Sequence, residues 1–170
     1  MKKLLVVVDM QNDFVTGCLG TPEARAIVPA LTEYVKNFDG EVIFTKDTHE
    51  KNYLETQEGK YLPVTHCIRG TAGWGIITEL KPYVGNDFYC KKTFGSVELA
   101  NKIKSGNYDE VQFCGVCTGI CVISNALMAK AFSPETPIKV LKDLCACVTP
   151  ESHETALNAM KLCQIDIIWG

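Results

Sequence analysis

The sequence predicts an α/β protein: a single three-layer α/β/α domain, residues 1–170, built around a six-stranded, mainly parallel sheet. Short apolar runs alternate along the chain with stretches of helical periodicity, which is the pattern of repeated strand–helix units. The runs "LLVVV", "EVIFT" and "IDIIW" are almost continuously apolar and rich in β-branched residues. Such runs are typical of strands that are covered on both faces. A chain of 170 residues fits one domain with one core.

Six strands and four helices are expected. The strands are predicted at Leu4–Val8, Glu41–Thr45, Asp87–Cys90, Glu110–Cys114, Ile138–Leu141 and Ile165–Ile168. The helices are predicted at Glu23–Asn37, Ser96–Ser105, Ile120–Phe132 and Pro150–Lys161. The last helix has the clearest start signal, because Thr149 can cap it and Pro150 opens its first turn. Parallel strands need right-handed crossovers, so these helices should cover both faces of the sheet.

The stretch Asp47–Gly75 shows little regular pattern, although it contains Tyr53, Tyr61 and Trp74. A loop of this length in a compact domain is usually functional or disordered, and its aromatic residues favour a functional segment.

Composition narrows the classes of partner. The formal charge of −3 does not suggest a nucleic acid or an anionic membrane as a partner. The apolar runs are far shorter than the roughly 20 residues that a bilayer span needs. The first run is short and is followed by Asp9, so we interpret it as a buried strand rather than a signal peptide. We therefore expect a cytoplasmic protein.

Nine cysteines in a chain without an export signal predict reduced thiols, most of which fill the core. Cys114 and Cys117 have CxxC spacing, but Cys114 lies inside a predicted strand. Structural zinc and a redox dithiol at this pair are therefore less favoured alternatives.

Polar and reactive side chains follow four of the predicted strands. The first strand ends at Asp9, and the next three end at "TKDTH", "KKTF" and "GVCTGIC". Ligands of such sheets bind beyond the carboxyl ends of the strands. One edge should therefore gather a carboxylate, an Asp/His pair, a lysine and a cysteine.

Cys121 is predicted to open a helix, where free N–H groups and the helix dipole stabilise a thiolate. The ammonium of Lys92 would lower the pKa of this thiol further, and Asp9 could accept its proton and return it to a leaving amine. This combination suits acyl transfer to water through a thioester. The same residues could instead be an apolar helix residue, a solvated lysine and a capping carboxylate, and spacing alone leaves both interpretations open.

A second cluster is predicted in the long loop. Asp47, His49 and His66 could supply a carboxylate and two imidazoles to a divalent ion, with Glu58 as a candidate fourth ligand. Ordinary loop histidines are the alternative. The third histidine, His153, lies in the first turn of the last helix and is expected to be structural.

Taken together, these segments resemble the isochorismatase-like cysteine hydrolases, and within them the nicotinamidase branch. The resemblance covers nearly the whole chain and rests on "VVVDMQNDF", "FTKDTH", "LPVTHCIRGTAGW", "KKTFGS" and "GVCTGICV", which occur in this order. It implies that Asp9 is the acid/base, that Lys92 is the lysine of the triad and that Cys121 is the nucleophile. It also implies that Asp47, His49 and His66 hold a metal ion: zinc first, with iron or manganese as alternatives.

The resemblance further implies hydrolysis of a small amide, nicotinamide, to nicotinate and ammonia in a self-associating protein. The backbone N–H groups of Cys117 and Cys121 would form the oxyanion hole, and a non-proline cis peptide would join Val116 to Cys117. The pocket lining is expected from residues that flank the matched segments: Phe14, Leu19, Leu62, Phe94, Val116 and Ile120.

Several residues differ from those that are common in nicotinamidases. "DTH" stands where "DWH" is common, Leu62 and Pro63 stand near the place of a common tryptophan, and Gly119 replaces an acidic residue in "TGIC". These differences leave the shape of the pocket open. A relative that cleaves another small amide or a carbamoyl compound is therefore the alternative enzyme, whereas the vinyl-ether reaction of isochorismatase would not need the cysteine. A metal- or thiol-sensing protein on the same fold is the non-enzymatic alternative.

Overall fold

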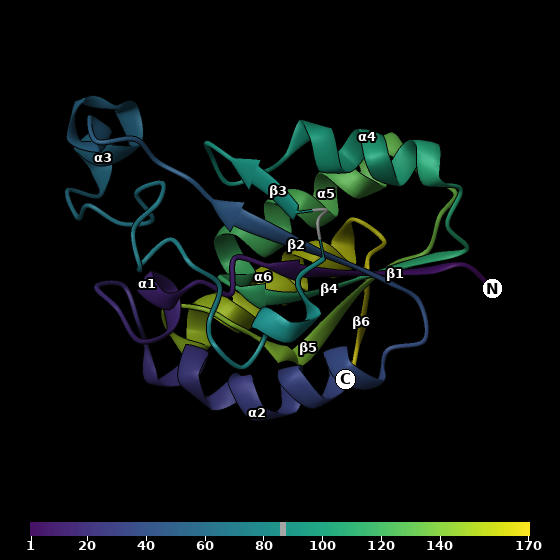
Figure 1. Ribbon diagram of the computed structural model, residues 1–170. Coiled ribbons are helices and arrows are strands. Elements are labelled where there is room, and N and C mark those ends of the chain that lie inside the picture. The colour runs from purple at the N-terminus through teal and green to yellow at the C-terminus, as the bar shows by residue number, and fades with distance from the viewer. Residues whose placement is uncertain (86–87) are drawn as a thin grey trace.

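The computed structural model describes residues 1–85 and 88–170, and within them a six-stranded sheet is enclosed by helices (Figure 1). All the strand pairs of this sheet are parallel, in the order β3-β2-β1-β4-β5-β6. The strands are β1 (Lys3–Val8), β2 (Glu41–Asp47), β3 (Phe88–Lys91), β4 (Glu110–Val116), β5 (Ile138–Ala146) and β6 (Asp166–Ile168). The six predicted strands are confirmed, except that Asp87, the predicted start of the third, lies outside the described residues.

The four predicted helices are also present. The α-helices are α1 (Asn12–Val15), α2 (Pro22–Asn37), α3 (Gln57–Tyr61), α4 (Val97–Gly106), α5 (Ile123–Phe132) and α6 (Pro150–Leu162). Three short turns complete the set: the 3₁₀ turns η1 (Tyr53–Glu55) and η2 (Lys81–Tyr83), and the π-helical turn η3 (Thr118–Val122). Two differences concern the site. The helix predicted from Ile120 begins earlier, as η3, and the loop between β2 and β3 contains η1 and α3.

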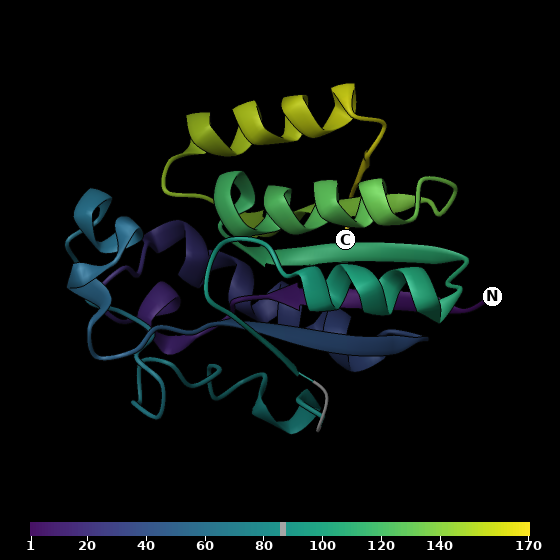
Figure 2. The same ribbon diagram turned by 90° about the horizontal axis from the view of Figure 1, so that it is seen from above.

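Two layers of helix cover the sheet, and Figures 1 and 2 show them from two directions. Helix α2 packs on one face, against β4 and β5, while α4, α5 and α6 pack side by side on the other. Strand β1 lies in the middle, and the five side chains Leu4–Val8 are fully buried. This burial explains the continuous apolar run in the sequence, because a strand that is covered on both faces has no solvent-facing side. Among the described residues, no helix has the length and apolar character needed to cross a bilayer.

Local capping sets where the helices begin. The Thr21 side chain accepts a hydrogen bond from the Ala24 N–H at 3.0 Å, and Pro22 follows it at the first position of α2. Thr149 caps α6 as predicted and forms a capping box with Ser152. Each cap satisfies backbone N–H groups that have no partner inside the helix.

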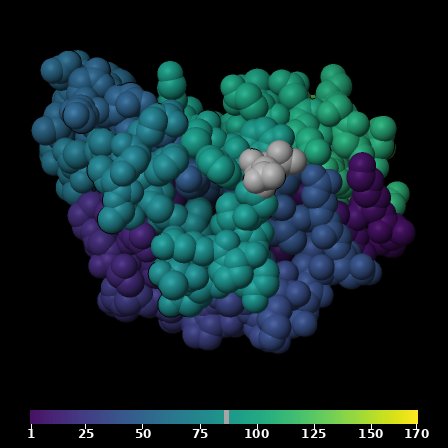
Figure 3. All heavy atoms as spheres, in the orientation of Figure 1, coloured from purple at the N-terminus to yellow at the C-terminus, as the bar shows by residue number. Residues whose placement is uncertain are grey.

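The strand order reverses between β1 and β4, which is the place where open α/β sheets bind ligands. Val8 pairs with Gly115 there, and Gly115 has a φ of +111°. A Cβ atom at Gly115 would overlap the backbone of Val8, so only glycine allows the two strands to approach at this point. Residues 48–75, which follow β2, stand out beside this edge and form the blue-to-teal lobe at the left of Figure 3.

Candidate active site and metal centre

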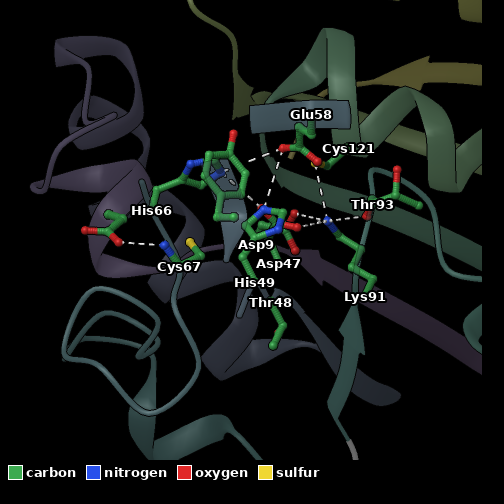
Figure 4. Close-up of polar contacts among 12 residues, drawn as sticks. Asp9, Asp47, Thr48, His49, Glu58, His66, Cys67, Lys91, Thr93 and Cys121 are labelled. Carbon is green, nitrogen blue, oxygen red and sulfur yellow. Dashed lines mark hydrogen bonds and ion pairs between the residues drawn. The ribbon is translucent and has the colours of Figure 1, made fainter. Parts of the chain in front are cut away.

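Three reactive side chains meet beyond the carboxyl ends of the strands (Figure 4). The Lys91 Nζ atom lies 2.5 Å from Asp9 Oδ2 and 3.4 Å from Cys121 Sγ. Asp9 follows β1, Lys91 is the last residue of β3, and Cys121 lies in η3 after β4. All three are buried. Strands that are distant in sequence therefore deliver a carboxylate, an ammonium and a thiol to one point.

The lysine of this cluster corrects the prediction, which named Lys92. Lys91 pairs in register with Asp47 of β2, and its side chain points into the buried site. The next residue along an extended chain points to the opposite side, so Lys92 is exposed and lines an outer hollow with His49 and Glu58. Two adjacent lysines look equivalent in the sequence, and only the phase of β3 separates them.

Asp9 is held by its own backbone and by Thr45. Its φ of +49° lies in the left-handed region, which costs energy for a residue with a side chain. The Thr45 hydroxyl donates to Asp9 Oδ1 at 2.7 Å, and the Asp9 N–H donates to Thr45 Oγ1 at 3.2 Å. Thr45 is not among the site residues predicted from the sequence. Its only signal was its position in a strand two residues before Asp47.

Burial and charge determine the protonation of the cluster. Burial raises the pKa of Asp9, and the ammonium of Lys91 only partly opposes it. Burial alone would lower the pKa of Lys91, but the negative charges around it outweigh this effect and raise that pKa. The pKa of Cys121 is raised well above its ordinary value by burial and by Asp9. The resting site therefore contains an ammonium and a protonated thiol beside Asp9, so the thiol must lose its proton as it attacks.

The backbone near Cys121 follows the expectation in one respect. The peptide bond Val116–Cys117 is cis. After it, the Cys117 carbonyl accepts hydrogen bonds from the Ile120 and Val122 N–H groups, which close the turn η3. The first N–H groups of such a turn have no partner within it. The N–H groups of Cys117 and Cys121 stay a prediction for the oxyanion hole.

Asn125, a buried residue of α5 that was not predicted from the sequence, holds the turn η3 in place through hydrogen bonds. Its Nδ2 donates to the Cys121 carbonyl at 2.8 Å and to the Phe94 carbonyl at 3.0 Å. Its Oδ1 accepts from the Ser96 N–H. Asn125 thus ties the nucleophile turn to the segment that follows β3.

The four predicted metal ligands form a second cluster beside the first (Figure 4). One ligand atom from each of Asp47, His49, Glu58 and His66 lies within 4.8 Å of all the others. Asp47 Oδ2 lies 2.9 Å from His49 Nε2 and 3.4 Å from His66 Nε2, and Glu58 Oε1 lies 3.6 Å from His49 Nε2. The structure therefore brings the predicted set together and includes Glu58.

The chemistry of this cluster fits a divalent cation. Two carboxylates and two imidazoles are a common donor set for zinc and for iron or manganese. The His66 Nδ1 atom is hydrogen-bonded to the Val64 carbonyl at 2.7 Å, which leaves Nε2 to face the cluster, as in many metal-binding histidines. Hydrogen bonds from the two histidines lower the pKa of Asp47 despite its burial, whereas burial and Asp47 raise the pKa of Glu58. A cation would offset this crowding of negative charge.

Gln11 holds the central ligand in place and was also missed. Its Oε1 accepts from the Asp47 N–H at 2.7 Å, and its Nε2 donates to the Asp47 carbonyl at 2.9 Å. The same Nε2 donates to the Trp74 carbonyl. Tyr53 contributes from the loop, since its buried ring packs 4.6 Å from the ring of His49.

One cavity of about 300 Å³ joins the two clusters. Cys121, Asp47, Glu58 and His66 lie in its wall. The six residues expected to line the pocket all border this cavity: Phe14, Leu19, Leu62, Phe94, Val116 and Ile120. The remaining histidine, His153, lies outside both clusters and contacts Thr118 at 2.8 Å. The cavity thus offers a mostly apolar chamber, with a thiol at one point and the predicted metal ligands at another.

Comparison with known proteins gives concordant results. The Isochorismatase domain family matches residues 3–168. The uncharacterized isochorismatase family protein PncA of Bacillus subtilis is 31% identical over 175 residues, with 93% of each chain covered. The nicotinamidase/pyrazinamidase of Mycobacterium tuberculosis is 25% identical, with 98% of each covered. Among solved structures, the pyrazinamidase of Pyrococcus horikoshii in complex with zinc superposes with a TM-score of 0.85, at 28% identity and full coverage of both chains.

Proposed function

The chain belongs to the isochorismatase family, and we propose that it is a metal-containing cysteine amidohydrolase that converts nicotinamide and water to nicotinate and ammonia. The observation that carries this proposal is the buried contact of Lys91 with both Asp9 and Cys121 at the wall of the cavity. The relatives named nicotinamidase and pyrazinamidase support the choice of an aromatic carboxamide as substrate.

The first half of the reaction forms a thioester. Asp9 accepts the thiol proton of Cys121 while the sulfur attacks the amide carbon, and the Lys91 ammonium stabilises both anionic groups. The N–H groups of Cys117 and Cys121 receive the developing oxyanion, where one donor can contribute roughly 3 kcal/mol of barrier lowering. Asp9 then returns the proton to the leaving nitrogen. The C–N bond breaks, ammonia leaves, and the acyl group remains on Cys121.

The second half releases the acid. Asp9 is a carboxylate again and takes a proton from a water molecule that attacks the thioester carbon. The tetrahedral intermediate uses the same N–H donors and collapses with cleavage of the C–S bond. The proton passes from Asp9 to the sulfur, which restores the thiol of Cys121 and leaves the carboxylate product.

The metal would be held by Asp47, His49, His66 and Glu58. Such an ion supplies a Lewis acid that can orient a ring nitrogen of the substrate, directly or through water. Within the chain, Asp47 connects this cluster to the triad, since its Oδ1 lies 3.6 Å from Lys91 Nζ.

A second candidate is hydrolysis of a different small amide or of a carbamoyl compound. The specific observation in its favour is the residue Thr48 between Asp47 and His49, where a tryptophan is common in nicotinamidases. Here Thr48 instead accepts a hydrogen bond from the Trp74 indole at 2.8 Å. The chain beside the proposed metal ligands is therefore built differently from that pattern.

The decisive experiment is ammonia release from a panel of amides that includes nicotinamide, pyrazinamide, benzamide and an aliphatic amide. Nicotinamide should be cleaved fastest, and a chelator should reduce turnover of the ring-nitrogen substrates more than that of benzamide. Cys121→Ala protein serves as the blank. If the wild-type protein releases no more ammonia than this blank from any amide, the proposal is wrong.

A further inference from the structure

A second pair of cysteines lies beside the nucleophile, in the wall of the same cavity. Cys117 and Cys147 directly follow the paired residues Val116 and Ala146 of the neighbouring parallel strands β4 and β5. Neighbouring strands lie about 4.8 Å apart, and disulfide-bonded residues have Cα atoms about 4.4–6.8 Å apart. Both residues line the cavity, so their side chains point to the same side of the sheet edge. The backbone therefore places the two sulfur atoms within reach of each other.

The surroundings of Cys147 favour a thiolate. The Gly119 N–H donates a hydrogen bond to Cys147 Sγ at 3.4 Å. Hydrogen bonds from the Cys117 thiol, the Ser152 hydroxyl and nearby backbone N–H groups lower the pKa of Cys147 to about 5, although burial opposes this shift. The same contact with Cys147, together with burial, raises the pKa of Cys117. Of the two thiols, Cys147 therefore has the lower pKa, and it also accepts the hydrogen bond from Gly119.

Access to Cys147 comes from two sides. Its residue borders the catalytic cavity and also a second hollow, which it shares with Gly119, Ile120 and Ser152. A small neutral oxidant can therefore reach the sulfur even though the residue is only 4% exposed. The catalytic thiol differs, since the pKa of Cys121 is raised well above its ordinary value. Reactivity of cysteines toward peroxide follows thiolate character, so Cys147 should react first.

We propose that Cys147 is a peroxide-reactive site and that Cys117 is its resolving partner, so that a hydroperoxide converts the pair into a disulfide in the wall of the catalytic cavity. In the first step the Cys147 thiolate attacks one oxygen of hydrogen peroxide, the O–O bond breaks, and the leaving hydroxide takes up a proton from the solvent. Cys147 is thereby oxidised to a sulfenic acid, and the peroxide is reduced to water. In the second step the Cys117 sulfur attacks the Cys147 sulfur, the S–O bond breaks, and a second water leaves with the thiol proton. A dithiol reductant reverses the change.

The functional consequence rests on the function proposed above. Cys117 also carries one of the two candidate N–H groups of the oxyanion hole, four residues before the nucleophile. A bond from its side chain to Cys147 would constrain this peptide and narrow the cavity beside Cys121. Peroxide should therefore inactivate the enzyme reversibly, while the metal cluster remains intact.

The test uses the full chain treated with hydrogen peroxide, followed by intact mass measurement and peptide mapping. We expect the loss of two hydrogens and a cross-linked peptide pair that contains Cys117 and Cys147, both reversed by dithiothreitol. Cys147→Ser and Cys147→Ala should each abolish the cross-link, and Cys163→Ser, which changes an exposed cysteine at the C-terminal end of α6, should leave it unchanged.

Cys121→Ala separates this proposal from the proposed function, because that variant has no catalytic thiol but should still form the cross-link. Its mass change would support the dithiol even if no amide were hydrolysed by the wild type. Oxidation that goes only to Cys121, a cross-link between Cys117 and Cys121, or a Cys147 that stays reduced while Cys163 is oxidised would each overturn the proposal.

Discussion

The cluster that we propose to be catalytic and the cluster that we propose to bind metal are neighbours, but they are built in different ways. Asp9, Lys91 and Cys121 lie at or just beyond the ends of three strands, and the register of the sheet brings them together. Of the metal ligands, only Asp47 belongs to a strand. His49, Glu58 and His66 come from the long chain between β2 and β3 (Figure 1).

This difference indicates which interactions hold each cluster in place. The proposed triad is held by buried backbone and by hydrogen bonds from Thr45 and Asn125. The metal cluster places two carboxylates close together, and the pKa of Glu58 is raised by burial and by Asp47 as a result. We therefore expect the triad to persist without metal, whereas the loop should depend on the ion for its order.

The largest expected effect is on the triad. Cys121→Ala should reduce amide turnover by at least about a thousandfold, because no other group can form the thioester. Metal content and melting temperature should stay near those of the wild type, because the metal cluster does not include this residue. Turnover and metal analysis on the same preparation check this. An active Cys121→Ala protein, with activity lost instead in Cys117→Ala, would move the nucleophile.

The two adjacent lysines offer a matched pair. Lys91→Met should lower kcat by about a hundredfold or more, because it leaves Asp9 and Cys121 without the buried cation between them. Lys92→Met changes an exposed side chain, so activity should remain within about twofold, a difference of under 1 kcal/mol in barrier. Steady-state kinetics of both variants decide the assignment. Equal losses of activity in the two variants would contradict the assignment of Lys91, rather than Lys92, to the site.

Removal of a loop ligand should sharpen the contrast between the clusters. His66→Ala should lose the bound ion, raise KM and lower the melting temperature by several degrees, since binding to the folded state alone stabilises it. His153→Ala, which leaves both clusters intact, should retain the ion. Metal content, limited proteolysis of the β2–β3 loop and thermal melting provide the readouts. A His66→Ala protein with a full complement of metal would remove this residue from the ligand set.

A smaller effect is expected from the hydrogen bond to Asp9. Asp9 must be ionised to accept the thiol proton, and its pKa is raised by burial, so kcat/KM should fall on the acid side at a pH above the ordinary aspartate range. The Thr45 hydroxyl stabilises the charged form. Thr45→Val should therefore raise the pKa of Asp9 further and move the acid limb to higher pH, with a severalfold loss at mildly acidic pH and little change on the alkaline side. A pH profile of kcat/KM checks the shift, and an unmoved acid limb would show that another group controls it.

The smallest effect is expected from Glu58→Gln. The neutral amide retains an oxygen ligand and relieves the repulsion with Asp47, so the variant should still bind the ion, with weaker affinity and near-normal kcat. Competition with a graded series of chelators measures the affinity. Loss of the metal as complete as in His66→Ala would make Glu58 an essential ligand rather than an auxiliary one.

The sequence by itself predicted the architecture and most residues of the two proposed sites. Continuous apolar runs such as Leu4–Val8 identified buried parallel strands, because a strand covered on both faces has no solvent side to alternate with. The Thr149 cap was readable because capping is a local interaction. Asp9, Asp47, His49 and Cys121 were predicted as site residues because each lies at, or a few residues beyond, the end of a strand that could be recognised.

The tertiary structure alone decided the details that depend on phase and on contacts distant in sequence. The choice of Lys91 over Lys92 depends on which of the two side chains faces the site at the end of β3. Because the two residues are identical, the sequence does not distinguish them. Thr45 beside Asp9 lies 36 residues away in the chain. The proposed pairing of Cys117 with Cys147 depends on the register of β4 against β5. Register is set by packing of the whole sheet, so the positions that it brings together cannot be read from either strand alone.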